Sequence, residues 1–227
     1  MMALIQKIRR RGLVNLLEIQ FNRIVPVWLF RFSMGDVFEL DVDSLRQLAD
    51  QSANDDLVYQ VVMDCDDRQR LREKTWNSVP IETTQNDYGF AVGAADAPTD
   101  FQGGVWGGVE SFIESNLGFR LLFDADQAWI YCAYIDPSVR GKGTYQRLLA
   151  FAVKHLNQQG YHRIYVVVQP WNKASIHVHR KFSRRRIGRI TVVRILRWAS
   201  VFGSGNLTKD RTWTTEPETN PVLFKIS

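Results

Sequence analysis

The stretch WIYCAYIDPSVRGKGTYQRLL, residues 129–149, decides the fold. An apolar and aromatic run reaches Ile135, Asp136 and Pro137 end it, and a glycine turn leads into an amphipathic segment that begins near Thr144. This order predicts a buried strand, a tight turn and a helix. Backbone N–H groups at such a helix start point toward one place, so the sequence predicts a phosphate or pyrophosphate site there.

The segments after the turn extend the pattern to a strand–helix–strand unit. An apolar stripe at helical spacing predicts a helix that ends at Gly160. The stripe consists of Tyr145, Leu148, Leu149, Ala152 and Leu156. Arg163–Val168 is a second apolar strand that Pro170 ends, and Asn172–Phe182 is a further helix. A strand, a helix and a strand with this spacing predict a right-handed crossover and a parallel pair.

Ahead of the central stretch the sequence predicts one strand and two helices. The strand covers Asp36–Leu40, and a helix over Leu45–Gln51 is predicted to be capped by Asp43 or Ser44. A second helix is predicted to run through residues 58–76.

Antiparallel strands are predicted on both sides of the strand–helix–strand unit. Gly89–Ala95 and Val105–Ile113 are expected to form a hairpin or meander, and Ile190–Trp198 and Val222–Ile226 two closing strands. The polar, Gly/Thr-rich segment between the closing strands is predicted to be a mobile loop. The expected fold class is α/β (α+β), with a mixed, mostly antiparallel central sheet and flanking helices.

Length and composition suit one large domain with an N-terminal appendage. A chain of 227 residues with 45% hydrophobic content can bury a substantial core. An imperfect helical pattern over residues 2–24 predicts a helical arm at 1–30, followed by one domain at 31–227. The arm is expected to pack on the domain or on a second copy of the chain, as in a homodimer. The alternative is peripheral membrane contact with Arg9–Arg11 at the headgroups.

Cysteine usage and hydropathy indicate a cytoplasmic protein. The two cysteines, Cys65 and Cys132, lie far apart in unlike settings and build neither a disulfide framework nor a zinc spacing. No apolar run approaches the roughly 20 residues needed to cross a bilayer. The basic N-terminus lacks the small-residue cleavage site of a secretory signal.

The positive charge of the chain is concentrated in one block. Residues 137–200 contain 14 Lys and Arg and no Asp or Glu, so the rest of the chain carries 5 − 14 = −9. A basic block of this size points to an anionic partner. A phosphorylated cofactor, a nucleic acid and a membrane surface all qualify.

The turn resembles the pyrophosphate loop of the Gcn5-related N-acetyltransferases, the GNAT superfamily. Arg140 and Gly143, placed after Ile135-Asp136-Pro137, match that loop, and Tyr145 stands where its last small residue usually falls. From the residues themselves, the amides of Val139–Tyr145 are expected to hold a pyrophosphate, with charge added by Arg140 and Lys142. The predicted loop contacts are Val139, Arg140, Gly141, Lys142, Gly143, Thr144 and Tyr145.

A second family signature lies on the predicted helix 172–182. Its matching residues are Asn172, Ser175, Val178 and Lys181. His179 takes the place of a tyrosine, and Ser183-Arg184 replaces Gly-Phe. The resemblance covers residues 88–198 firmly and the first strand and helices loosely. It implies an acetyl-CoA-dependent N-acetyltransferase that acts on a primary amine of a small molecule or peptide, by direct transfer in a ternary complex.

The resemblance also implies roles for individual residues. Ala133, Tyr134 and Ile135 are expected to contact the pantetheine, and an amide there to polarise the thioester carbonyl. Asn172, Ser175 and Lys181 are further expected cofactor contacts.

Helical spacing places His179 on the inward face of its helix with Ser175, Val178 and Phe182, where the family's tyrosine protonates the departing thiolate. The resemblance therefore predicts that His179 is the acid. The alternative is a core histidine satisfied by a backbone carbonyl. His177 faces away from His179, so the pair predicts no metal site.

The candidates for the general base are carboxylates and phenols near the central strand. Glu110 and Tyr134 are the named candidates, with Glu114 and Tyr131 nearby, and water is the alternative. The acceptor is expected to be set by Tyr88–Trp106, the helices before it and the 199–220 loop, none of which carries a recognisable code.

The run RKFSRRRIGR, residues 180–189, suggests nucleic acid when taken alone. No nucleic-acid-binding motif and no alternating aromatic residues accompany it. The run is interpreted as contacts to the 3′-phosphate end of the cofactor and as solvated surface. The rival functions are a non-catalytic coenzyme A-binding module and a basic nucleic-acid- or ribosome-associated protein.

Overall fold

The computed structural model describes residues 24–26, 29–51, 56–75 and 86–227. The predicted arm at residues 1–30 lies almost entirely outside these ranges, so the arm and its partners remain predictions. The chain groups into two compact units. The central unit consists of Glu39–Ser111 and Phe123–Val166, and the terminal unit consists of the residues up to Phe38, Phe112–Leu122 and Val167–Ser227.

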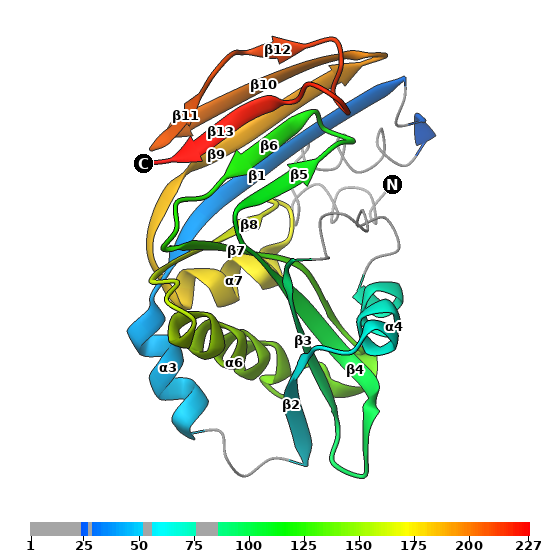
Figure 1. The fold of residues 1–227 in the computed structure, drawn as a ribbon, viewed down its shortest axis with the longest axis vertical. Coiled ribbons are helices and arrows are strands. Elements are labelled where there is room, and N and C mark those ends of the chain that lie inside the picture. Colours follow the sequence, from blue (N-terminus) through cyan, green and yellow to red (C-terminus); the bar gives the residue numbers. More distant parts are fainter. Residues whose placement is uncertain (1–23, 27–28, 52–55, 76–85) are drawn as a thin grey trace, which may run out of the picture. The chain divides into compact units, whose positions relative to one another are not determined.

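The central unit is built on strands of one sheet, in the order β8-β7-β4-β3-β2 (Figure 1). The strands are β2 (Leu57–Val62), β3 (Tyr88–Ala94), β4 (Ala97–Gly108), β7 (Gln127–Ile135) and β8 (Arg163–Val168). β7 and β8 are parallel and the other neighbours are antiparallel. The predicted antiparallel pairing and the predicted parallel pair are confirmed. The strand predicted at Val105–Ile113 has other bounds, because β4 begins at Ala97 and ends at Gly108, and β5 begins at Ser111.

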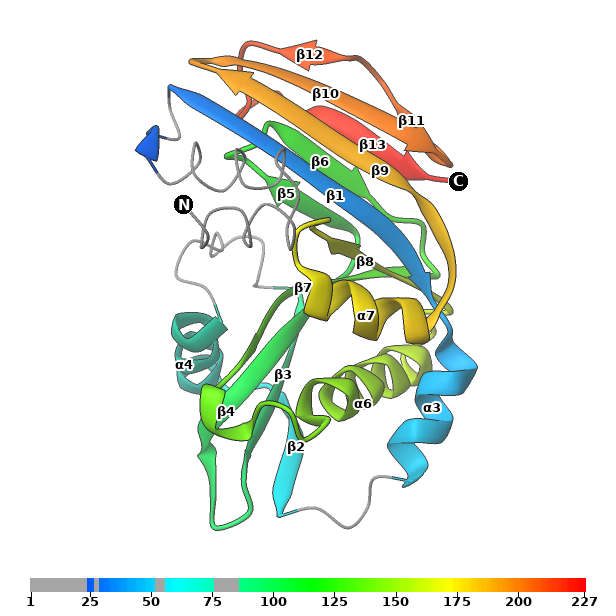
Figure 2. The same ribbon diagram turned by 180° about the vertical axis from the view of Figure 1, so that it is seen from behind.

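Helices cover both faces of this sheet. The helix α6 (Thr144–Gln158) packs across β3 and β4 on one face, beside α3 (Val42–Gln51) (Figure 2). On the opposite face lies α4 (Cys65–Thr75). The predicted stripe on α6 is confirmed, because its leucine and alanine members are fully buried. Each buried leucine stabilises the fold by roughly 1.5–3 kcal/mol.

Two local predictions for the central unit are wrong. Residues 58–62, predicted as the start of a helix, belong to β2, because pairing with β3 outweighs their weak helical pattern. The helix predicted at residues 58–76 therefore shortens to α4. The cap of α3 is Asp41 rather than Asp43 or Ser44, since the Asp41 carboxylate accepts from both the N–H and the hydroxyl of Ser44.

In its described residues, the terminal unit contains two sets of strands and the helix α7 (Lys173–Lys181). In the first set β1 (Phe30–Leu40) lies beside β9 (Ser183–Ile195), followed by β10 (Trp198–Gly205) and β12 (Trp213–Thr214). The second set has the order β11-β13-β6-β5. Its strands are β11 (Leu207–Lys209), β13 (Val222–Ile226), β6 (Phe119–Leu122) and β5 (Ser111–Glu114). The helix α7 (Lys173–Lys181) precedes β9.

The loop predicted at residues 199–220 is wrong for most of its length. This segment supplies β10, β11 and β12, whose exposed residues gave it a polar, loop-like composition. The closing strands are confirmed as β9 and β13. β9 begins earlier than predicted, at Ser183, and ends at Ile195, so Trp198 belongs to β10. Most strand pairs are antiparallel, which confirms the predicted fold class. No helix in the described part of the chain is long and apolar enough to cross a membrane.

Candidate active site

The end of β7 extends beyond its ladder with β8. The parallel register pairs Gln127–Ile130 with Arg163–Val166, whereas β7 continues to Ile135. The three residues predicted to contact pantetheine, Ala133–Ile135, lie on this extension, and Ala133 is exposed. A strand end beyond a ladder can accept hydrogen bonds from an extended ligand.

A bulge interrupts β7 at Cys132. The antiparallel register with β4 joins Trp106 to Tyr131 and Gly104 to Tyr134, so two residues of β7 oppose Val105. Cys132 has a φ of 49°, a left-handed conformation that costs a residue with a side chain about 1–2 kcal/mol. Bulges of this kind re-aim backbone groups and occur beside active sites. The sequence contained no signal for the bulge.

The turn after β7 is held by its own side chains. The Asp136 carboxylate accepts from the N–H of Ser138 at 3.0 Å and caps the short 3₁₀ helix η1 (Pro137–Val139). Arg140 Nε donates to the Ile135 carbonyl at 2.7 Å, and buried Thr144 donates its hydroxyl to the Val139 carbonyl at 2.8 Å. These bonds fix the path of the backbone from β7 into α6.

Two glycines give the turn its shape. Gly141 and Gly143 have φ values of 79° and 77°, which other residues rarely adopt. Gly143 is the N-cap of α6 and offers no side-chain hydrogen bond to the first turn, which also contains no acidic residue. The helix start therefore presents uncapped N–H groups and the positive end of its dipole.

The charges around this helix start suit a pyrophosphate. Arg140 and Lys142 are exposed beside it. The neighbouring carboxylate, Asp136, faces Ser138 and Lys74, and these contacts lower its pKa. Glycine backbone, uncapped amides and two cations match the donor set that a pyrophosphate requires.

Tyr145, the bulky departure from the loop pattern, is half-buried. Burial raises the pKa of its phenol. This placement agrees with a side chain that points into the protein.

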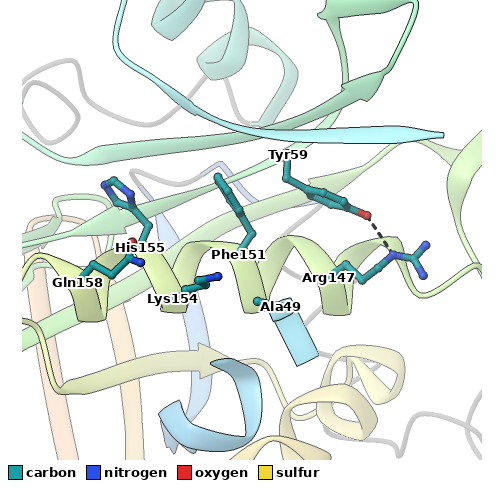
Figure 3. Close-up of a pocket in the computed structure, with 7 residues that line it drawn as sticks. All are labelled: Ala49, Tyr59, Arg147, Phe151, Lys154, His155 and Gln158. Atoms are coloured by element: carbon teal, nitrogen blue, oxygen red, sulfur yellow. Dashed lines mark hydrogen bonds between the residues drawn. The ribbon is translucent and has the colours of Figure 1, made fainter. Parts of the chain in front are cut away.

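A cavity of about 180 Å³ lies against α6, close to the turn. Figure 3 shows the residues around it: Ala49, Tyr59, Arg147, Phe151, Lys154, His155 and Gln158. Arg147 connects the cavity wall with the turn, because its Nε donates to Tyr59 Oη at 3.1 Å and its Nη2 donates to the Lys142 carbonyl at 2.8 Å. The sequence patterns did not identify Arg147 as part of the turn.

The helix α7 in the terminal unit has the orientation that its spacing predicts. Asn172 caps it by accepting from the N–H of Ser175 at 3.2 Å. His179 is buried, His177 is exposed, and Lys181 is exposed with its ammonium 5.0 Å from the Phe182 ring centroid. Asn172 and Ser175 thus serve the structure of the helix, and their cofactor contacts remain predictions.

The geometry of His179 favours the alternative that it is a core histidine whose ring is bonded to a backbone carbonyl. Its Nδ1 lies 2.8 Å from the Ser175 carbonyl oxygen, which can only accept, so Nδ1 carries the proton. Burial lowers the pKa of the imidazole, against the raising effect of that bond. A neutral ring held in this tautomer has an acceptor, not a donor, at Nε2.

The candidate bases do not gather at one place. On β4, Tyr134 pairs with Gly104, and Trp129 pairs with Gly108. Glu110 follows Gly108, after the last residue of β4. Glu110 and Tyr134 are therefore several register positions apart. Glu110 is exposed in a turn with a φ of 66°. The Tyr134 ring lies under the Arg140 guanidinium, 5.8 Å from its carbon to the ring centroid.

Glu114, the other carboxylate that the sequence brought forward, is part of β5. Burial raises its pKa to about 7, and the charge of Arg31 opposes the rise.

A buried hydrogen bond joins the phenol of Tyr131, the residue before the bulge, to the carboxyl of Asp87 near the end of β4. The sequence singled out Tyr131 but not Asp87. Tyr131 Oη donates to Asp87 Oδ2 at 2.5 Å, and Asp87 Oδ1 accepts from the Val109 N–H at 3.2 Å. Asp87 is 4% and Tyr131 5% exposed. The only sequence signal for Asp87 was an acidic residue directly before a buried strand.

Part of the basic run has a structural use. Arg186 and Arg189 of β9 both donate to the buried Asp36 carboxylate, with Arg186 Nη2 and Arg189 Nε each 2.7 Å from Oδ1. These two guanidinium groups therefore neutralise a carboxylate, which leaves a smaller surface for a phosphate or nucleic acid than the sequence suggested.

A family model and several solved structures match the chain. The model is that of the acetyltransferase (GNAT) family, and it matches residues 56–183, which is more than half of the chain. A search of curated proteins found no match.

Among the solved structures, a Drosophila protein has a TM-score of 0.51 at 9% identity, covering 79% of this chain and 56% of its own. A GCN5-related N-acetyltransferase-like protein from Streptococcus suis has a TM-score of 0.49 at 11% identity, with coverages of 82% and 68%. An aminoglycoside acetyltransferase from an uncultured soil metagenomic sample has a TM-score of 0.40 at 18% identity, with coverages of 56% and 86%. The likeness to the Drosophila protein concerns the fold alone. The chain spans less than two thirds of the length of several structures that it matches.

Proposed function

Because the chain belongs to the acetyltransferase (GNAT) family, we propose that it moves an acetyl group from acetyl-CoA to a primary amine. The observation that carries this proposal is the turn from β7 into α6. Its two left-handed glycines, its uncapped helix start and its flanking cations form a donor set suited to the pyrophosphate of coenzyme A.

In the proposed complex the residues of the central unit have separate tasks. The N–H groups at the start of α6, with Arg140 and Lys142, hold the pyrophosphate. Ala133–Ile135, beyond the ladder with β8, hold the pantetheine by backbone hydrogen bonds. When bound, acetyl-CoA supplies an acetyl group activated as a thioester. A backbone N–H of the bulged segment polarises the carbonyl of that group.

The proton for the departing thiolate comes, in this proposal, from water or from His179. The bond from His179 Nδ1 to Ser175 weighs toward water, because the buried imidazole must gain a second proton before it can act as an acid.

A thiol-release assay tests the proposed function. The purified protein is mixed with acetyl-CoA and, in turn, an aminoglycoside, a polyamine, a lysine-containing peptide and an arylalkylamine, and the products are weighed by mass spectrometry. We expect at least one amine to gain one acetyl group as the free thiol forms. Binding of acetyl-CoA without thiol release for any amine would instead support the non-catalytic module.

Replacement of Arg147 by glutamine is expected to weaken coenzyme A binding by about 3- to 10-fold. The variant loses the hydrogen bond from Nη2 to the Lys142 carbonyl that steadies the turn, and such a bond contributes roughly 0.5–1.5 kcal/mol. Calorimetric titration with coenzyme A measures the effect.

The matched control is Lys154→Gln on the same helix, which removes a cation paired with the exposed Asp50. This variant should bind coenzyme A within twofold of the parent. Equal weakening by both variants would mean that general charge, rather than the bond to the turn, is responsible.

A further inference from the structure

The outer strands of the terminal unit carry a group of exposed apolar side chains on one face. β9 and β10 form a hairpin in which Ile195 pairs with Trp198 next to the turn. Side chains alternate between the two faces of a strand, so Trp198, Ser200 and Phe202 share one face of β10. Trp213 of β12 pairs with Ser200 and therefore joins this face. The apolar members, Ile195, Trp198, Phe202 and Trp213, are between 47% and 53% exposed.

The opposite face of β10 belongs to the core. Ala199 and Val201 alternate with the exposed residues and are fully buried. On the exposed face the rings of Trp198 and Trp213 stack, with their centroids 5.1 Å apart. The core is thus filled from the other face, and filling it does not explain the exposed residues. A cluster of large apolar side chains on a surface marks a site of interaction.

The turn between β9 and β10 presents a further apolar residue, in a backbone conformation that does not suit it. Leu196 and Arg197 form this turn. Leu196 is 49% exposed and has a φ of 55°. Turns of two residues with a positive φ favour glycine, asparagine or aspartate at that position. A strained residue at an exposed position that another residue would fit better indicates a function.

Hydrogen bonds on both sides hold this turn in place. The N–H of Leu196 donates to the Leu29 carbonyl at 2.9 Å, at the start of β1. Buried Arg194 donates from Nε to the Leu196 carbonyl at 3.1 Å and from Nη1 to the Asn116 carbonyl at 3.0 Å. Figure 1 shows the start of β1 and this turn at the same end of the strands. The apolar side chains are therefore presented on a fixed support.

The charges of the hairpin are positive. Residues 183–209, which include the whole hairpin, contain no Asp or Glu. Arg197 is exposed in the turn, and the ammonium of Lys209 lies 5.4 Å from the centroid of the Phe202 ring. One carboxylate approaches the base of the turn, where Glu218 lies 3.9 Å from Arg194 and offsets its charge. The exposed charge beside the apolar side chains thus suits an anionic partner.

This combination favours a lipid bilayer over a protein surface. Tryptophan concentrates at the boundary between headgroups and acyl chains, because its ring is apolar and its N–H is polar. The long stem of an arginine can lie in the apolar layer while its guanidinium reaches the headgroups. A hairpin tip offers few side chains, whereas a stable protein interface needs about 800 Å² from each partner.

The position at which the preceding chain joins the terminal unit supports the same partner. Residues 1–23 join the described chain at Ile24, which is 76% exposed and close in sequence to Leu29. The sequence of this segment contains Lys7 and Arg9–Arg11. An anionic surface that contacts the turn would also attract these basic residues.

We propose that the turn between β9 and β10 docks the protein on an anionic phospholipid bilayer. Ile195 and Leu196 enter the outer part of the acyl-chain region. The indoles of Trp198 and Trp213 lie at the headgroup boundary, where Arg197 binds lipid phosphate. This inference does not depend on the proposed acetyl transfer, because no residue of the turn belongs to the site at β7 and α6. The two proposals can therefore fail separately.

Sedimentation with sucrose-loaded vesicles tests the proposal. The 227-residue chain is mixed with vesicles of phosphatidylcholine alone or of phosphatidylcholine with phosphatidylglycerol. The variants are Leu196→Asn, Trp198→Thr and Arg197→Gln. The matched control is Met63→Asn, which removes a 76% exposed apolar side chain from the central unit.

We expect the parent to bind vesicles that contain phosphatidylglycerol and added salt to weaken the binding. Leu196→Asn and Trp198→Thr should lower the partition constant about 5-fold and about 10-fold, because each removes apolar surface from the bilayer. Arg197→Gln should lower it about 5-fold at low salt and less at high salt, since its contribution is electrostatic. Met63→Asn should stay within twofold of the parent.

Thermal unfolding without lipid separates docking from a structural role of Leu196. Asparagine adopts a positive φ more readily than leucine. Leu196→Asn should therefore raise the melting temperature by about 2–4 °C while it weakens bilayer binding. A leucine that serves only the fold would instead lower the melting temperature when replaced. If Trp198→Thr fails to fold, Leu196→Asn still decides.

Four outcomes would overturn the proposal. The first is a parent that does not sediment with vesicles containing phosphatidylglycerol. The second is a parent that sediments while Leu196→Asn and Trp198→Thr bind equally well, because another segment then makes the contact. The third is equal loss in Met63→Asn, which would make general surface hydrophobicity responsible. The fourth, seen by light scattering, is a parent dimer that binds no vesicles and that Leu196→Asn converts to monomers, which would make this face an interface between two copies of the chain.

Discussion

Replacement of Gly143 by valine is expected to weaken acetyl-CoA binding by about 100-fold or more. Gly143 has a φ of 77° at the N-cap of α6, and a β-branched residue adopts that conformation only with strain of roughly 1–3 kcal/mol. Space is not the obstacle, because an added Cβ would lie 3.6 Å from Arg147 Nη1. We expect the backbone to leave the left-handed region, which turns the first N–H groups of α6 away from the pyrophosphate.

The matched control is Gly160→Val, beyond the far end of the same helix. Gly160 has a φ of 95°, and no heavy atom lies within 4 Å of an added Cβ, so the substitution introduces a similar backbone strain. We expect this variant to lose stability but to bind acetyl-CoA within twofold of the parent in calorimetry. Equal affinity of Gly143→Val and Gly160→Val would show that the turn does not hold the cofactor.

Replacement of Gly188 by alanine is expected to destabilise the terminal unit by about 3 kcal/mol or more. Gly188 lies on β9 opposite Gly205 of β10. An added Cβ would lie 1.9 Å from the carbonyl oxygen of Ser204, so the two strands must move apart. Urea unfolding followed by far-ultraviolet circular dichroism measures the change in the free energy of unfolding.

Thr191→Ala on the same strand is the control for this prediction. Thr191 pairs with Phe202 and is half-buried, so the change removes a methyl and a hydroxyl group without a clash. Its cost is expected to stay near 1 kcal/mol. If Gly188→Ala costs no more than Thr191→Ala, the close approach of β9 and β10 is not a constraint on the fold.

The sequence predicted best those elements whose pattern depends on burial on both faces or along one stripe. The apolar runs of β7 and β8 and the stripe of α6 are signals of this kind, and all three elements are confirmed. The sequence predicted least well the strands whose pattern comes from pairing rather than burial. β2 and β10 expose much of their surface, so their residues resemble those of a helix or a loop until the neighbouring strand is known.

The features of the candidate site also differ in whether adjacent residues or pairing with distant residues determine them. The turn at residues 136–145 could be predicted, because its glycines, its cations and the following helix are adjacent in the sequence. The Asp87–Tyr131 pair joins residues 44 positions apart, and no spacing rule connects them. The bulge at Cys132 depends on the register with β4, which a single strand does not encode.

The structure changes the interpretation of two charged or titratable features, because it shows their hydrogen-bond partners. The predicted anion-binding run at 180–189 contributes Arg186 and Arg189 to a buried Asp36, so part of its charge serves the terminal unit. His179 reaches the inward face as predicted, but its bond to the Ser175 carbonyl is the arrangement of a core histidine. Residue type and helical spacing cannot distinguish these cases, because the deciding partner is a carboxylate or a carbonyl elsewhere in the fold.

Calorimetric titration of the parent protein with acetyl-CoA tests most directly the claim that the turn from β7 into α6 is a coenzyme A site. We expect one binding site per chain, with a dissociation constant between about 1 μM and about 1 mM. We also expect added salt to weaken the binding, because Arg140 and Lys142 are exposed. The absence of any saturable binding at millimolar acetyl-CoA would show that the turn is not a coenzyme A site.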